Sequence, residues 1–143
     1  MTAVALKVGI VGGGPWGWSL ARAAARAGSE VVIHSRRETK EGRLIHVTQR
    51  YEDVAQAQLV VLAVPSNHVR EVGRALGDHL SGAHFLVHGI RGLAPLDNES
   101  DRAGDTLRTV SDVLREETPV RRLGALGGPV QADELHHGTA SAL

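Results

Sequence analysis

Three glycines near the start of the chain, Gly12, Gly14 and Gly17, follow the spacing GxGxxG. An apolar run (residues 5–11) precedes them, and a helical pattern follows. The first glycine allows a tight turn, the second lets the backbone approach a pyrophosphate, and the third lets the helix pack closely on the strand. Pro15 fits this helix start because its missing amide would have had no intrahelical partner. The loop predicts a dinucleotide site; a glycine-rich turn without a ligand is the alternative.

The stretch HSRRE places Ser35, Arg36 and Arg37 at the end of the next apolar run. A carboxylate here would bind the adenosine ribose and favour NAD, whereas basic residues would pair with a 2′-phosphate. Guanidinium groups bind phosphate in bidentate fashion, and a serine hydroxyl can donate to it. We therefore expect NADP(H) to be preferred, with NAD(H) also accepted. The alternative is that both arginines are solvated surface charges.

The elements that must position these residues alternate along the chain. Short apolar runs predict buried strands at residues 5–11, 30–35, 59–64, 84–89 and 122–127, with a weaker strand at 44–48. Helical patterns cover residues 16–27, 67–79 and 106–116, with a short helix at 51–57. In the third helix the apolar face comprises Leu107, Val110, Val113 and Leu114. This alternation predicts an α/β fold: a doubly wound, mainly parallel sheet of Rossmann type in three layers, α/β/α.

Composition excludes several classes of function. The 143 residues suit a single domain, and 16 basic against 16 acidic residues leave no formal net charge to attract nucleic acid or an anionic membrane. The chain has no cysteine, and its adjacent histidines, His136 and His137, do not form a chelating pair, so no metal site is expected. The apolar runs are much shorter than the ~20 residues that cross a bilayer, and no signal peptide is evident. We therefore expect a cytoplasmic protein.

Three motifs carry a family resemblance: GGGPWG, LAVPSN and LGGPVQADEL. With them, the chain resembles the N-terminal domain of the bacterial NAD(P)-dependent glycerol-3-phosphate dehydrogenases. Trp16 with Gly17 matches the family's GxGxWG loop, and residues 63–66 match its AVPS turn. The family's KG(I/L) turn corresponds to HGI at residues 88–90, and its SGP motif to GGP at residues 127–129.

The resemblance implies that the cofactor contacts the glycine loop and the AVPS turn. Pro65 would fix that turn and Ser66 could hydrogen-bond the cofactor; an ordinary strand-to-helix turn with Ser66 or Asn67 as N-cap is the alternative. The expected cofactor-binding residues are Gly12, Gly14, Pro15, Trp16, Gly17, Ser35, Arg36, Arg37, Val64, Pro65 and Ser66.

The chain departs from the family pattern in ways that bear on catalysis. The active-site lysine of KG(I/L) is His88 here, which we take as the candidate catalytic residue, with a strand-end polar group as the alternative. The insertion that usually follows the second strand is short. The family's helical domain, which supplies the proton donor and much of the substrate pocket, is absent from these 143 residues. We therefore expect residues 1–143 to form an NAD(P)-binding domain that does not turn over alone.

The function implied is interconversion of glycerol 3-phosphate and dihydroxyacetone phosphate by hydride transfer, with a small phosphorylated substrate as partner and a homodimer left open. Two alternatives remain: a non-catalytic NADP(H)-binding module, or a related dehydrogenase of the β-hydroxyacid or NADPH-oxidoreductase kind. Arg91 is either a substrate-phosphate contact or a surface arginine, and Trp18 and Phe85 are expected to pack. The closing TASAL resembles the start of another strand.

Overall fold

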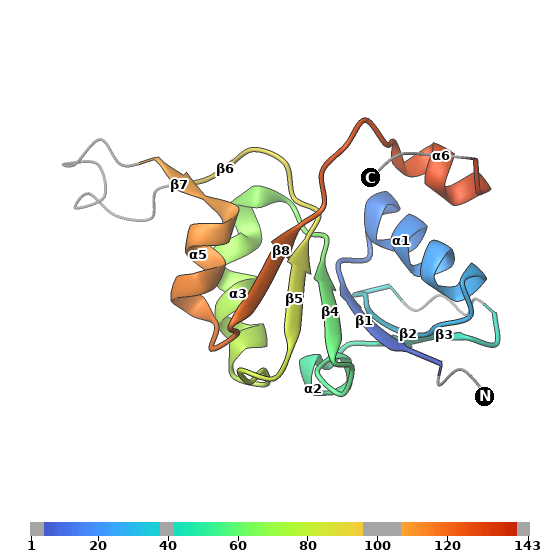
Figure 1. The fold of residues 1–143 in the computed structure, drawn as a ribbon, viewed down its shortest axis with the longest axis horizontal. Coiled ribbons are helices and arrows are strands. Elements are labelled where there is room, and N and C mark those ends of the chain that lie inside the picture. The colour runs from blue at the N-terminus through green and yellow to red at the C-terminus, as the bar shows by residue number, and fades with distance from the viewer. Residues whose placement is uncertain (1–4, 38–41, 96–106, 140–143) are drawn as a thin grey trace.

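A six-stranded parallel sheet forms the centre of the computed structural model, which describes residues 5–37, 42–95 and 107–139 (Figure 1). The strand order is β3-β2-β1-β4-β5-β8, and every neighbouring pair is parallel. The strands are β1 (Lys7–Val11), β2 (Glu30–His34), β3 (Ile45–Thr48), β4 (Leu59–Leu62), β5 (Phe85–His88) and β8 (Arg122–Ala125). The predicted doubly wound Rossmann-type sheet is confirmed.

Helices cover both faces of this sheet (Figure 1). One face carries α1 (Pro15–Arg26), with α6 (Ala132–His137) packed against it. The other carries α2 (Tyr51–Val54), α3 (Val69–Gly77) and α5 (Val110–Glu117), and the 3-10 turn η1 (Ser66–His68) leads into α3. A short antiparallel pair, β6 (Leu93–Ala94) and β7 (Arg108–Thr109), lies beside α5. No helix in the described ranges is long and apolar enough to span a membrane.

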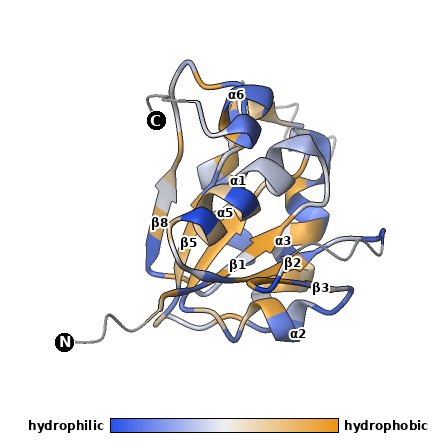
Figure 2. Cartoon of the chain, turned by 90° about the vertical axis from the view of Figure 1, so that its right-hand side faces the viewer, coloured by the Kyte–Doolittle hydropathy of each residue, from blue (hydrophilic) through white to orange (hydrophobic). Residues whose placement is uncertain are grey.

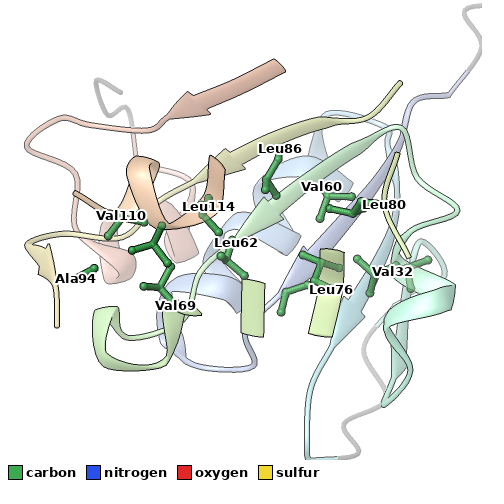
Figure 3. Close-up of a cluster of buried hydrophobic side chains, with 13 residues drawn as sticks. Val32, Val60, Leu62, Val69, Leu76, Leu80, Leu86, Ala94, Val110 and Leu114 are labelled. Carbon is green, nitrogen blue, oxygen red and sulfur yellow. The ribbon is translucent and has the colours of Figure 1, made fainter. Parts of the chain in front are cut away.

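The strands are held by side chains that alternate between two buried clusters. Val8, Ile10 and Ile33 pack toward α1. Leu62 and Leu86 belong to the larger cluster, which Figure 3 shows together with residues of α3 and α5. Figure 2 shows that the strands are mostly hydrophobic, whereas α6 is mostly hydrophilic. Strands covered on both faces must be apolar on both, which is why continuous apolar runs marked them in the sequence.

The start of the third helix differs from the prediction. Thr109 is the N-cap of α5, and its hydroxyl accepts the Asp112 amide while the Asp112 carboxylate accepts the Thr109 amide. Because this capping box fixes the helix start, Leu107 lies before β7 with 71% of its surface exposed. Phe85, which was expected to pack, is 39% exposed, and its ring packs under the Arg122 guanidinium, whose Cζ lies 3.9 Å from the ring centroid. Residues 140–143 of the closing TASAL, and residues 96–106, lie outside the described residues.

Candidate nucleotide-binding site

Two glycines of the loop between β1 and α1 are required by backbone contacts. Gly12 has a φ of 126°, and a Cβ there would lie 2.2 Å from the carbonyl oxygen of Ala63. A Cβ on Gly17 would lie 1.8 Å from the carbonyl oxygen of Gly12. Since neither contact could be tolerated, these glycines bring α1 against the carboxyl ends of β1 and β4.

Gly14 has a different environment. It is the exposed N-cap of α1, and a Cβ there would meet no atom within 4 Å. Pro15 occupies the first helical turn, and no side chain caps the amides of that turn. An anion can therefore approach the backbone at this position, as the loop spacing predicts.

The three residues after β2, Ser35, Arg36 and Arg37, have different surroundings. Ser35 is buried against Gly13, and its Oγ accepts a hydrogen bond from the Arg37 amide at 3.2 Å, so it shapes the turn. Burial lowers the pKa of His34, and the nearby Arg36 charge lowers it further. Arg36 therefore lies near His34, whereas Arg37 lines a cavity beside the glycine loop.

Two cavities lie along the carboxyl edge of the sheet. The first, which we call the α1–α6 cavity, has a volume of about 600 Å³. The second, the β5–β8 cavity, has a volume of about 900 Å³. The α1–α6 cavity is lined by Gly13, Gly14, Pro15, Trp18, Ser19, Arg22, Arg37, Ala132, Asp133, His136 and His137. The β5–β8 cavity is lined by Trp16, Gly89, Arg91, Leu126, Gly127, Gly128, Pro129, Val130, Gln131 and Ala132.

Trp16 joins α1 to the end of β5. Its indole N–H is buried without a hydrogen-bond partner, and a Cβ on Gly89 would lie 2.5 Å from that nitrogen. Arg91 donates from Nη2 to the Val130 carbonyl at 3.0 Å and is the charged side chain among the described residues of the β5–β8 cavity lining. Arg91 is exposed and also lines this cavity, so the surface-arginine and substrate-phosphate alternatives both stay open.

The turn after β4 lies at the carboxyl edge but lines neither cavity. Pro65 is exposed and accepts the His68 amide through its carbonyl at 3.0 Å. Pro65 precedes η1 and His68 precedes α3, and neither helix start has a side-chain cap. The alternative that Ser66 or Asn67 serves as an N-cap is therefore wrong, while the cofactor contacts of Val64, Pro65 and Ser66 stay predictions.

His88 is directed toward α5. Only 6% of its surface is exposed, and Nε2 lies 2.9 Å from Oγ of Ser111. Burial lowers the pKa of His88, and the Ile90 backbone offsets part of that effect. The imidazole is therefore neutral near pH 7 and lies on the wall of neither cavity. Its catalytic role stays a prediction.

Sequence reasoning missed Arg22 and His136. Nη1 of Arg22 contacts Nδ1 of His136 and lies 3.2 Å from its Nε2, which links α1 to α6 across 114 positions of sequence. No local pattern signals a contact over that separation. In the described ranges no three or more His, Asp or Glu side chains are placed to hold a metal ion.

Comparison with known proteins identifies the family to which this chain belongs. Residues 41–143 match the family model described as NAD-dependent glycerol-3-phosphate dehydrogenase N-terminus. The chain is 29% identical over 157 residues to a glycerol-3-phosphate dehydrogenase [NAD(P)+] of Lysinibacillus sphaericus, covering 93% of this chain and 44% of the relative. A Paramagnetospirillum magneticum enzyme of the same name is 28% identical, with 96% and 53% covered. The chain thus spans about half the length of these relatives.

Solved structures agree on the fold. The glycerol-3-phosphate dehydrogenase of Coxiella burnetii superposes with a TM-score of 0.75 at 18% identity, covering 93% of this chain and 44% of that one. At this identity the likeness concerns the fold alone.

Proposed function

Because this chain belongs to the family of NAD-dependent glycerol-3-phosphate dehydrogenase N-termini, we propose that residues 1–143 form the dinucleotide-binding domain of such an enzyme. The reaction would be the interconversion of glycerol 3-phosphate and dihydroxyacetone phosphate. The relatives in Lysinibacillus and Paramagnetospirillum carry names of NAD(P)+-dependent enzymes. A cytoplasmic location and a homodimer stay predictions.

The glycine loop is the observation that carries this proposal. Gly12 and Gly17 are held by backbone contacts that no side chain could share, whereas Gly14 opens onto empty space. The amides of the first turn of α1 would bind the pyrophosphate, aided by the helix dipole. The bound nicotinamide would supply the hydride chemistry. Trp16, Gly89 and the other residues of the β5–β8 cavity would exclude water around the reacting groups.

We propose further that NADP(H) is preferred over NAD(H). Arg36 and Arg37 are both exposed just after β2, where the doubly wound fold brings the adenosine ribose. The residue that follows β2 is Ser35, at the position where a carboxylate would repel a 2′-phosphate. Guanidinium groups at this place would stabilise the extra dianion of NADPH.

Calorimetric titration of the chain with NADPH and NADH tests this preference. NADPH should bind more tightly, and Arg36→Ala or Arg37→Ala should shrink the difference by ~1 kcal/mol or more. Arg121→Ala is the matched control, because Arg121 is an exposed arginine next to the amino end of β8. Equal affinity of the wild-type chain for both cofactors would refute the preference.

A non-catalytic NADP(H)-binding module is the second candidate, favoured by His88. Where the family has its active-site lysine, this chain has a buried imidazole bonded to Ser111. The natural gene product at its full length should be assayed for NADPH oxidation with dihydroxyacetone phosphate, and with small 3-oxo acids for the β-hydroxyacid alternative. Turnover of the phosphate ester supports the dehydrogenase. NADPH binding without turnover of either substrate supports the module.

A further inference from the structure

The start of helix α6 forms a wall that the two cavities share. Ala132, the first residue of α6, lines both the α1–α6 cavity and the β5–β8 cavity. Gln131, just before it, lines the β5–β8 cavity, and Gly14 of the glycine loop lines the α1–α6 cavity. Figure 1 shows α6 beside α1, at the end of the segment that follows β8. The start of α6 therefore lies where the two cavities adjoin, close to the proposed pyrophosphate site.

Apolar burial contributes little to the position of α6. The structure describes all six of its residues, and none of them is buried. The helix is mostly hydrophilic (Figure 2). Its partly buried Leu135 packs against the apolar cluster that contains Leu20 and Ala21 of α1. Since one partly buried leucine removes little apolar surface from water, the place of α6 depends largely on polar bonds to α1.

Ser19 bonds the start of α6. Only 2% of this residue is exposed, and its Oγ lies 2.7 Å from the Ala132 carbonyl oxygen and 2.8 Å from the Pro15 carbonyl oxygen. The hydroxyl has one proton, which these two acceptors share. Ser19 thereby links the start of α6 to the first turn of α1, whose amides are the proposed pyrophosphate contacts.

Arg26, in the last turn of α1, bonds the other end of α6. It donates from Nη2 to the Leu135 carbonyl at 2.5 Å and from Nη1 to the His136 carbonyl at 3.2 Å. The last carbonyls of a helix lack intrahelical partners and carry the negative end of its dipole, so a guanidinium is favourable there on both counts. The contact of Arg22 with His136 adds a bond between these two ends. Because α6 is bonded along its length, it cannot tilt or slide on α1 without losing some of these bonds.

We propose that Ser19 and Arg26 are positioning residues of the nucleotide site, which act through α6: they hold its first residue beside the glycine loop, where it retains a bound dinucleotide. This inference rests on the proposed dinucleotide site. Arg26 is not part of the described lining of either cavity, so its effect on the site passes through α6. Weakened contacts act mostly on the dissociation rate of a complex. Because Ala132 borders both cavities, release of NADPH and of NADH should be affected alike.

Release of the reduced cofactors tests this role. The chain loaded with NADPH or NADH is mixed rapidly with excess oxidised cofactor, and the fluorescence of the displaced cofactor gives the dissociation rate. Ser19→Ala and Arg26→Met should each raise this rate about fivefold for both cofactors. Arg26→Lys, which keeps a charged donor beside the last carbonyls of α6, should restore much of the slow release. Arg115→Met is the matched control, because Arg115 is an exposed arginine in the last turn of α5.

Hydrogen exchange without nucleotide distinguishes positioning of α6 from general stabilisation. In both variants the amides of α6 should exchange about fivefold faster, while those of β1 and β4 keep their wild-type rates. Arg26→Met, at an exposed side chain, serves alone if Ser19→Ala does not fold.

Three results would overturn the inference. Wild-type release rates in the variants, from a chain that binds both dinucleotides, would refute the role of α6 and leave the proposed function standing. Faster release with faster exchange throughout the sheet, or with unchanged exchange in α6, would also refute it, because the two residues would then not act through α6. If the wild-type chain binds neither dinucleotide, this inference and the proposed function both fail.

Discussion

Gly17→Ala should lower the stability of the fold, whereas Gly14→Ala should weaken nucleotide binding and leave the stability nearly unchanged. At Gly17 the new Cβ would lie 1.8 Å from the Gly12 carbonyl oxygen and 3.7 Å from Cβ of Ala63. An ordinary carbon to oxygen contact is about 3.3 Å, so α1 must move about 1.5 Å from β1. Overpacking against rigid backbone costs about 3 kcal/mol. Alanine offsets about 1 kcal/mol of this cost because it favours the helix more than glycine does.

The net loss for Gly17→Ala is therefore about 2 kcal/mol of unfolding free energy, a large part of the total for a domain of this size. Gly14→Ala should change stability by less than about 0.5 kcal/mol, because no atom lies within 4 Å of the new Cβ and the backbone there is extended. Its effect should fall on binding, since the methyl group occupies space that a pyrophosphate would use. NADPH and NADH should both bind about tenfold more weakly.

Urea unfolding followed by circular dichroism measures the first effect, and calorimetric titration with both dinucleotides measures the second. The two variants serve as controls for each other, because they make the same chemical change three residues apart. The steric reasoning fails if Gly17→Ala unfolds at the wild-type urea concentration. The assignment of the loop to a dinucleotide fails if Gly14→Ala binds both cofactors as tightly as wild type.

Four further substitutions test packing, charge and burial. Leu114→Ala removes a fully buried side chain and should lower the free energy of unfolding, measured in urea, by about 3 kcal/mol. Leu107→Ala, at a side chain that is 71% exposed, should lower it by less than about 0.5 kcal/mol. Similar losses in the two variants would contradict the packing of α5. Hydrogen bonds led by Arg74 hold the pKa of Glu117 below its usual range, so their stabilisation is present above the ordinary glutamate pKa and is lost as pH falls through the lowered value. Glu117→Gln should lose about 1 kcal/mol at pH 7 and show a shallower acid dependence of stability, and an unchanged acid profile would argue against this ion pair. Burial lowers the pKa of His88, so the unfolded chain binds more protons than the folded one below about pH 6.5, and stability should fall there. His88→Gln should therefore flatten the dependence of melting temperature on pH between about pH 7.5 and 5.5. An identical slope in wild type and variant would mean that His88 is not buried.

The sheet was predictable because its strands are buried on both faces and so form continuous apolar runs. The glycine loop was predictable because its three glycines form a local spacing pattern between one strand and one helix. The contact of Gly12 with Ala63, at the end of β4, is visible only in the structure. The start of α5 was missed because Leu107 continues the apolar periodicity, while the capping box of Thr109 and Asp112 determines where the helix begins. Periodicity describes one face of a helix and carries no information about its first residue.

The missed part of the candidate site depends on contacts between distant segments. Strand alternation places His88 on the same face as Leu86, but the sequence does not say which helices cover that face. The contact of Arg22 with His136 exists only because α6 returns to pack on α1. Such tertiary contacts follow from the assembled layers, so Arg22 and the α6 residues of the α1–α6 cavity were found only in the structure. Gly14, Pro15 and Arg37, which also line this cavity, were already expected from the sequence.

The two tryptophans of the chain lie two residues apart on α1, yet each lines a different cavity. Trp18 borders the α1–α6 cavity, and Trp16 borders the β5–β8 cavity. Each cavity therefore has its own intrinsic fluorophore. In a chain that retains Trp18 alone, emission would follow occupancy of the α1–α6 cavity. In a chain that retains Trp16 alone, it would follow occupancy of the β5–β8 cavity, so the order in which a ligand fills the two cavities could be resolved in time.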